Sequence, residues 1–162
     1  MLTTTQNQLL KAAIAADGTM SAQPNTTAGN TVIKGLLEQD AAPAFVVWKS
    51  VLTLDEITQN GFTWTEVDNL AVGKARIWEW MFKNSTNSIN PSKSNVQAGI
   101  VECWSGTAGR LAVQAVVLSH CKRNATRLEK ILATGTGTTL SPAVMGYEGP
   151  ISTDDIETAR NS

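Results

Sequence analysis

The segment at residues 63–82 places the strongest constraint on the fold. It reads TWTEVDNLAVGKARIWEWMF and holds three of the chain's five tryptophans. Thr63 precedes Glu66 by three residues, which is the spacing of a reciprocal capping box at a helix start. Apolar residues then recur at helical spacing and form one stripe: Trp64, Val67, Leu70, Ala71, Ala75, Trp78, Met81 and Phe82. Because this much apolar volume needs several partner helices, the segment predicts the central helix of an α-helical domain.

Composition indicates a folded protein with few surface charges. The chain has 162 residues, of which 42% are hydrophobic and 17% are charged, against about 25% charged residues in typical domains. Such a surface suits a protein that buries itself in an assembly, or one solvated by Thr, Asn, Ser and Gln. The net charge of −1 supplies no overall attraction to DNA or to an anionic membrane. With no signal-peptide pattern and no apolar stretch of about 20 residues, we expect a cytosolic origin and no membrane contact.

Further helices are expected from capping residues and apolar periodicity. They cover residue 4 or 5 to residue 16, then residues 30–39, 54–59, 91–104 and 108–132, the last as one long helix with an apolar seam near a 3.5-residue repeat. Thr53 and Glu56 form a capping box, and Asn90 with Pro91 suits a helix opening. The stretch 45–48 is strand-like in composition but has no evident pairing partner, so an extended segment packed on helices is favoured.

The fold class predicted is all-α, a helical bundle of about five to six helices with an extended C-terminal arm. Residues 1–133 form the helical domain, and residues 134–162 form the arm. Composition changes at Thr134, where a run of Thr, Gly, Ser and Pro begins without helical period. The arm cannot build a core alone, so we expect it to be ordered only when a partner holds it. Ser152 and Asp155 can begin one short terminal helix.

No residue set predicts catalysis, a cofactor or a metal. His120 is the single histidine, and its neighbour Cys121 points about 100° away on a helix. Cys103 could approach His120 from another helix, so a Cys–His site stays open, but a structural role for all three residues is favoured, with both cysteines as buried thiols. The glycines near Gly135 lack the rest of a phosphate-loop pattern.

Four cations gather near the end of the predicted long helix: Lys122, Arg123, Arg127 and Lys130. Cations there stabilise the helix dipole. A salt bridge to a neighbouring subunit and a phosphate contact are the alternatives.

Three blocks carry a family resemblance: WTEVDNLAVGKARIWEWM, INPSKSNVQAGI and ATGTGTTLSPA. Together they resemble a family of small tailed-bacteriophage structural proteins, over about residues 8–161. A helical core with an arm is most similar to the head–tail connector (neck) adaptors. This resemblance implies a structural subunit of a homo-oligomeric, twelvefold ring beneath the portal, which extends the DNA channel and offers a docking surface to the tail.

The resemblance also implies partners and contact residues. The partners would be the portal protein and tail or neck proteins in the virion, after synthesis in the host bacterial cytoplasm. The four tryptophans at positions 64, 78, 80 and 104 would anchor the core or an inter-subunit face. The four cations would make inter-subunit contacts or non-specific contacts with genomic DNA in the channel. Portal or neighbouring-subunit contacts would come from the arm: Thr134, Leu140, Pro142, Met145, Tyr147, Ile151 and Ile156.

Other functions remain as alternatives. A head-decoration or tail-completion protein, or a small non-structural phage protein, would fit the same resemblance. A DNA-binding regulator would need a basic recognition face, and a hydrolase would need a clustered catalytic set.

Overall fold

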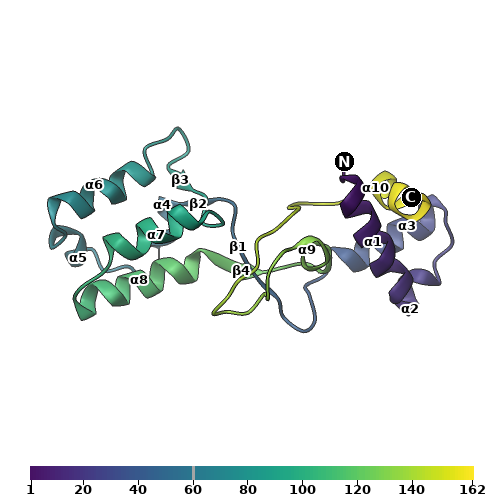
Figure 1. Ribbon diagram of the computed structural model, residues 1–162, viewed down its shortest axis with the longest axis horizontal. Helices are drawn as coiled ribbons and strands as arrows, with labels where there is room; N and C mark the ends of the chain where they lie inside the picture. Colours follow the sequence, from purple (N-terminus) through teal and green to yellow (C-terminus); the bar gives the residue numbers. More distant parts are fainter. Residues whose placement is uncertain (60) are drawn as a thin grey trace. The chain divides into compact units, whose positions relative to one another are not determined.

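A computed structural model describes residues 1–59 and 61–162 of the chain. Over these residues 53% of the chain is helical, in ten helices accompanied by two small two-stranded sheets (Figure 1). The prediction of a mainly helical protein is confirmed. The finer predictions of an all-α fold and of five to six helices are wrong, because some expected helices are broken and short strands occur between them.

The chain forms two compact units. One combines Met1–Val47 with Asn124–Ser162, and the other consists of Trp48–Arg123. We call them the terminal unit and the central unit. The divisions therefore fall after residues 47 and 123, whereas the sequence placed a single boundary after residue 133.

The terminal unit contains five helices: α1 (Thr4–Ala16), α2 (Gly18–Ser21), α3 (Thr27–Leu37), α9 (Arg127–Leu132) and α10 (Thr153–Asn161). α1 has the expected bounds, and Thr3 and Gln6 form a capping box at its start. α3 begins four residues earlier than a helix capped by Asn30 would, because Thr26 is its N-cap. Asn30 instead lies inside the helix and is buried.

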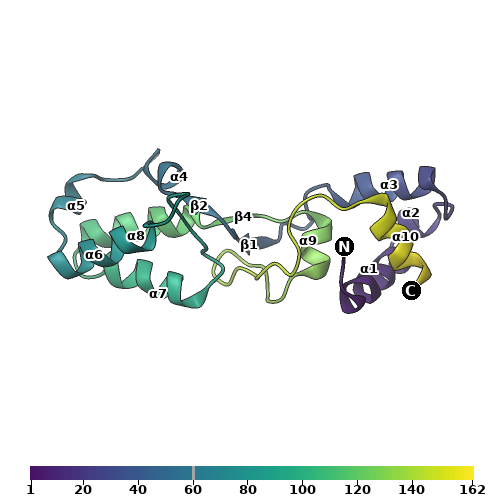
Figure 2. The ribbon, with the colours of Figure 1, turned by 90° about the horizontal axis from the view of Figure 1, so that it is seen from above.

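The C-terminal helix packs on the N-terminal helices. Figures 1 and 2 both show α10 beside α1, and α10 also contacts α3. Ile151, Ile156 and Ala159 are buried in one cluster with Leu10 and Ile33. The predicted helix start is confirmed, since the Ser152 side chain accepts a hydrogen bond from the amide of Asp155. Much of the segment read as a free arm is therefore part of the chain's own core.

The central unit contains β2 (Leu52–Thr53), α4 (Leu54–Thr58), α5 (Thr65–Asp68), α6 (Val72–Met81), β3 (Ser88–Ile89), α7 (Ser94–Cys103) and α8 (Ala108–His120). β2 and β3 pair antiparallel, with Leu52 opposite Ile89. The capping box of Thr53 and Glu56 is present at the start of α4, as predicted. α7 begins at Ser94 because Asn90 caps a turn, accepting hydrogen bonds from the amide and hydroxyl of Ser92.

The expected helix over residues 63–82 is two helices. α5 ends at Asp68 and α6 begins at Val72. The predicted capping box is absent: α5 has no side-chain cap, and the amide of Glu66 bonds the backbone oxygen of Thr63. The prediction of one continuous helix is therefore wrong.

The expected helix over residues 108–132 is also interrupted, and a strand replaces its middle. β4 (Lys122–Asn124) follows α8 and pairs with β1 (Val46–Trp48). The carbonyl of Cys121 accepts from the Lys49 amide at 2.9 Å, and the Ala125 amide donates to the Phe45 carbonyl at 2.8 Å. A continuous helix would use these two groups for its own ladder. The strand that pairs with residues 45–48 therefore lies within the segment that was predicted to be helical.

Candidate assembly surface

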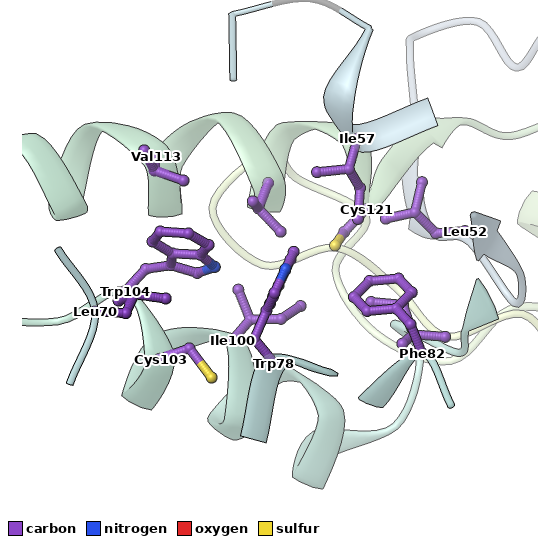
Figure 3. Packing of buried hydrophobic residues seen from close by; sticks show 12 residues of the cluster. Leu52, Ile57, Leu70, Trp78, Phe82, Ile100, Cys103, Trp104, Val113 and Cys121 are labelled. Atoms are coloured by element: carbon purple, nitrogen blue, oxygen red, sulfur yellow. The ribbon is translucent and has the colours of Figure 1, made fainter. Parts of the chain in front are cut away.

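An aromatic core fixes the orientation of α6. Trp78 points from α6 into the central unit, where its ring centroid lies 5.2 Å from that of Trp104 and 4.9 Å from that of Phe82 (Figure 3). Phe62 meets Trp104 edge to face at 5.6 Å. Edge-to-face contacts between large rings restrict rotation as well as burying area. α6 is consequently held with one defined face toward the core.

The opposite face of α6 is apolar and exposed. Trp80 follows Trp78 by two residues, or about 200° around the helix, and 74% of its surface is accessible. Val72 and Ile77 are exposed on the same helix. An open groove here is lined by Arg76, Ile77, Glu79, Trp80 and Met81. A surface of this kind, with an aromatic side chain and charges at its edge, is typical of protein–protein contacts.

The four tryptophans implied as anchors divide into two pairs. Trp78 and Trp104 are buried in the aromatic core, while Trp64 and Trp80 are at the surface. The apolar stripe in the sequence included Trp64, which is 61% exposed because the helix break precedes the core-facing turn. The stripe left out Trp80. The position of Trp80 outside the stripe was the sequence signal that this side of α6 is a surface.

The two cysteines are poor nucleophiles in this environment. Both are buried free thiols in the central unit. Burial raises the pKa of Cys103 to about 11 and that of Cys121 to about 12. Both side chains therefore remain protonated near neutral pH, and the thiolate needed for attack is not populated. The prediction of buried core thiols is confirmed.

The described residues, which leave out only residue 60, contain no group of three or more His, Cys, Asp or Glu side chains placed to hold a metal ion. Within the same part of the chain, no helix has the length and apolar character needed to cross a bilayer.

The predicted basic cluster is distributed over two elements and two units. Lys122 and Arg123 lie in β4 of the central unit, and Arg127 and Lys130 lie in α9 of the terminal unit. Arg127 donates to the Asp17 carboxylate at 2.6 Å. The ammonium groups of Lys122 and Lys130 stand 5.2 and 5.7 Å from the ring centroids of Trp48 and Phe45. The cations of this cluster are thus engaged inside the chain.

The predicted partner-binding residues of the tail differ in exposure. Thr134 and Leu140 are exposed, and Leu140 is 97% accessible. The remaining five are buried or half-buried in this structure: Pro142, Met145, Tyr147, Ile151 and Ile156. Ile151 and Ile156 can meet a partner only if α10 leaves α1 and α3.

Comparison of the chain with protein-family models, with curated proteins and with solved structures finds no match.

Proposed function

We propose that this protein is a structural subunit of a tailed-phage virion, a head–tail connector adaptor that assembles as a ring beneath the portal. The observation that carries the proposal is the exposed aromatic face of α6, held rigidly by the core beneath it. A ring subunit needs such a preorganised apolar surface, since less ordering entropy is then lost on assembly. The assignment to a phage virion rests on the resemblance of the three sequence blocks, and the expected twelvefold symmetry of the ring rests on the same resemblance.

The portal contact in this proposal comes from the loop at residues 134–142. Leu140 is the most exposed large apolar side chain after Met1. The end of the loop is anchored, because the Ala143 amide donates to the Val46 carbonyl at 2.9 Å. A short loop with a fixed end and an exposed leucine can enter a pocket at small entropic cost. Contacts by Ile151 and Ile156 would add to it only after release of α10.

The direct test is cryo-electron microscopy of the full chain mixed with its own phage's portal. We expect a ring of subunits capping the portal, with density joining residues 134–142 to it. The Leu140→Glu variant should bind the portal more weakly. Val32→Glu changes another exposed apolar residue of the terminal unit and is the matched control.

Absence of a complex with intact portal would contradict the adaptor role. Binding of the protein to the capsid exterior or to completed tails would instead favour a head-decoration or tail-completion role. Absence from purified virions would favour a non-structural phage protein.

A further inference from the structure

The C-terminal helix α10 makes specific polar contacts with the N-terminal part of the chain. Arg160 on α10 donates to the backbone oxygens of Gln23 and Pro24 at 2.7 and 3.0 Å. It also donates to the side-chain oxygen of Asn30 at 2.8 Å, and Asn30 is buried on α3. A planar guanidinium that meets three oxygens fixes both the position and the direction of its helix. α10 therefore has one defined position on the terminal unit.

Further contacts of α10 come from the same part of the chain. The Leu2 amide donates to the Asp155 carboxylate at 3.4 Å. The Asn25 side chain donates to that of Asn161 at 2.9 Å. These partners, like those of Arg160, belong to residues 1–30, and we call the surface that they form with α1 and α3 the α10 site. Because α10 and the α10 site come from separate stretches of sequence, every copy of the chain carries both.

Neither α10 nor the α10 site is stable without the other. Ile156 and Ala159 of α10 are buried in one cluster with Leu10 of α1 and Ile33 of α3. Removal of α10 would expose part of this apolar cluster to water. α10 has nine residues, and a helix of that length does not persist alone in water. Each α10 therefore needs an α10 site, and the site of another copy satisfies this need as well as its own.

The chain enters α10 through an exposed loop at residues 148–150, which we call the hinge loop (Figure 2). Gly149 has a φ of +104°, and a Cβ at this position would meet no other atom within 4 Å. The chain before the loop is held in place, because the Gln6 side chain donates to the Gly146 carbonyl at 2.8 Å. A change in the backbone of the hinge loop can therefore redirect α10 without moving packed atoms.

We infer that α10 is exchanged between copies of this chain. It packs on its own α10 site in the free subunit and on the α10 site of the adjacent copy in an assembly. The occupant is the α10 of a second copy because the structure shows that helix filling this site. The same groups pair in both forms, so the balance depends on the hinge loop and on the local concentration of neighbours. The inference rests on the proposed ring for its setting, and it names a contact that joins adjacent subunits.

The first test is cross-linking between two full-length copies that carry tags of different length. One copy carries Asn25→Cys and the other carries Asn161→Cys, at two exposed positions whose side chains are bonded in the structure. The native thiols are buried and react slowly. A short bifunctional maleimide should join copies of different size, both in concentrated protein and with the portal added. The yield should exceed that of a control mixture by at least about 10-fold, since exchange places the two thiols at a high effective concentration.

The control mixture uses a matched pair inside one helix. The Gln59 side chain donates to the Asp55 carboxylate at 3.0 Å, and both residues are exposed. Asp55→Cys and Gln59→Cys placed in one chain should cross-link within that chain. The same changes placed in separate copies should give only the background of random collisions.

The second test shortens the hinge loop. Deletion of residues 148–150 removes up to about 10 Å of reach, so α10 no longer returns to its own site. We expect dimers or larger assemblies by analytical ultracentrifugation, with the α10 amides as protected from hydrogen exchange as in the wild type. An insertion of the same length, made of Gly and Ser at this point, should keep α10 protected in a monomer.

Two outcomes overturn the inference. One is a mixture that gives no more links than its control, with or without the portal. The other is a shortened protein that stays monomeric with unprotected α10 amides. A ring on the portal without exchange would leave the connector role standing and remove only this inference. Exchange in concentrated protein that does not bind the portal would do the reverse.

Discussion

The terminal and central units use their apolar residues differently. The terminal unit has an aliphatic core, and it brings its last helix onto its first helices through contacts between residues more than 100 positions apart. Its exposed apolar residues are aliphatic side chains such as Leu9 and Val32. The central unit has an aromatic core and leaves Trp64 and Trp80 at the surface. The terminal unit thus covers its large hydrophobic helix faces, whereas the central unit exposes one on α6.

This difference separates residues that stabilise the fold from residues available for assembly. A buried tryptophan contributes to the free energy of unfolding through lost water contact and packing. An exposed tryptophan contributes little to unfolding and can be buried only by a partner. Four experiments test this difference between the units.

The largest effect is expected at the buried tryptophan of the central unit. Trp104→Ala should lower the free energy of unfolding of that unit by about 3–5 kcal/mol, because it leaves a large cavity. Trp80→Ala, the matched surface change, should alter it by less than about 0.5 kcal/mol. Urea titration followed by circular dichroism measures both. Similar losses in the two variants would mean that Trp80 is part of the core.

The next effect concerns the attachment of α10 in the terminal unit. Arg160 donates to the backbone oxygens of Pro24 and Gln23 and to the buried Asn30 side chain at 2.7–3.0 Å. Arg160→Met should cost about 1–3 kcal/mol, because it leaves the Asn30 oxygen unpaired. Hydrogen exchange should show faster exchange of the α10 amides and unchanged exchange of α6. Arg76→Met, which removes a cation from α6, is the control; equal protection of α10 in both variants would contradict the attachment.

A smaller effect distinguishes two threonines that look alike in the sequence. Thr53 caps α4, and its hydroxyl accepts from the Glu56 amide at 3.2 Å. Thr53→Ala should cost about 1 kcal/mol. Thr63→Ala should cost less than about 0.5 kcal/mol, since the Thr63 side chain does not cap α5. Thermal unfolding of the two variants measures both losses of stability. Equal losses would indicate that Thr63 forms a capping box after all.

The smallest effect is a pH dependence in the terminal unit. Hydrogen bonds from the Met20 amide and from Arg127 lower the pKa of Asp17 below its usual value. The unfolded carboxyl titrates near 3.9, so this stabilisation is fully present above about pH 5 and disappears as the pH falls through the lower folded value. Asp17→Asn keeps an acceptable cap but loses the charge. Its stability should lie slightly below that of the wild type near neutral pH and match it near pH 2; a constant difference across this range would exclude the ionised pair as the cause.

The sequence correctly predicted those helix boundaries and caps that depend only on residues close together in the chain. The boundaries of α1, the capping box of Thr53 and the start of α10 after Ser152 all follow from side chains within four positions of the bond they make. The burial of the two thiols, Cys103 and Cys121, was also predicted. Trp80 was the available but unused signal for the α6 surface, because it falls outside the stripe.

The same reasoning failed where two distant segments compete for one hydrogen bond. The apolar seam of residues 111–132 continues through Cys121 and Ala125, so no local feature predicts a break there. The break arises because Lys49 and Phe45 pair with those two residues. The signal for β4 was present only as the strand-like composition of its partner, residues 45–48.

Sequence patterns predicted the mainly helical character, several helix starts and the buried thiols, since these depend on propensity, capping and spacing over a few residues. Three features became evident only in the folded structure: the division into two units, the packing of α10 on α1 and α3, and the strand at residues 122–124 in place of a helix. These outcomes depend on hydrogen bonds and apolar contacts between residues far apart in the chain. Such contacts stabilise the fold only when both segments have come together.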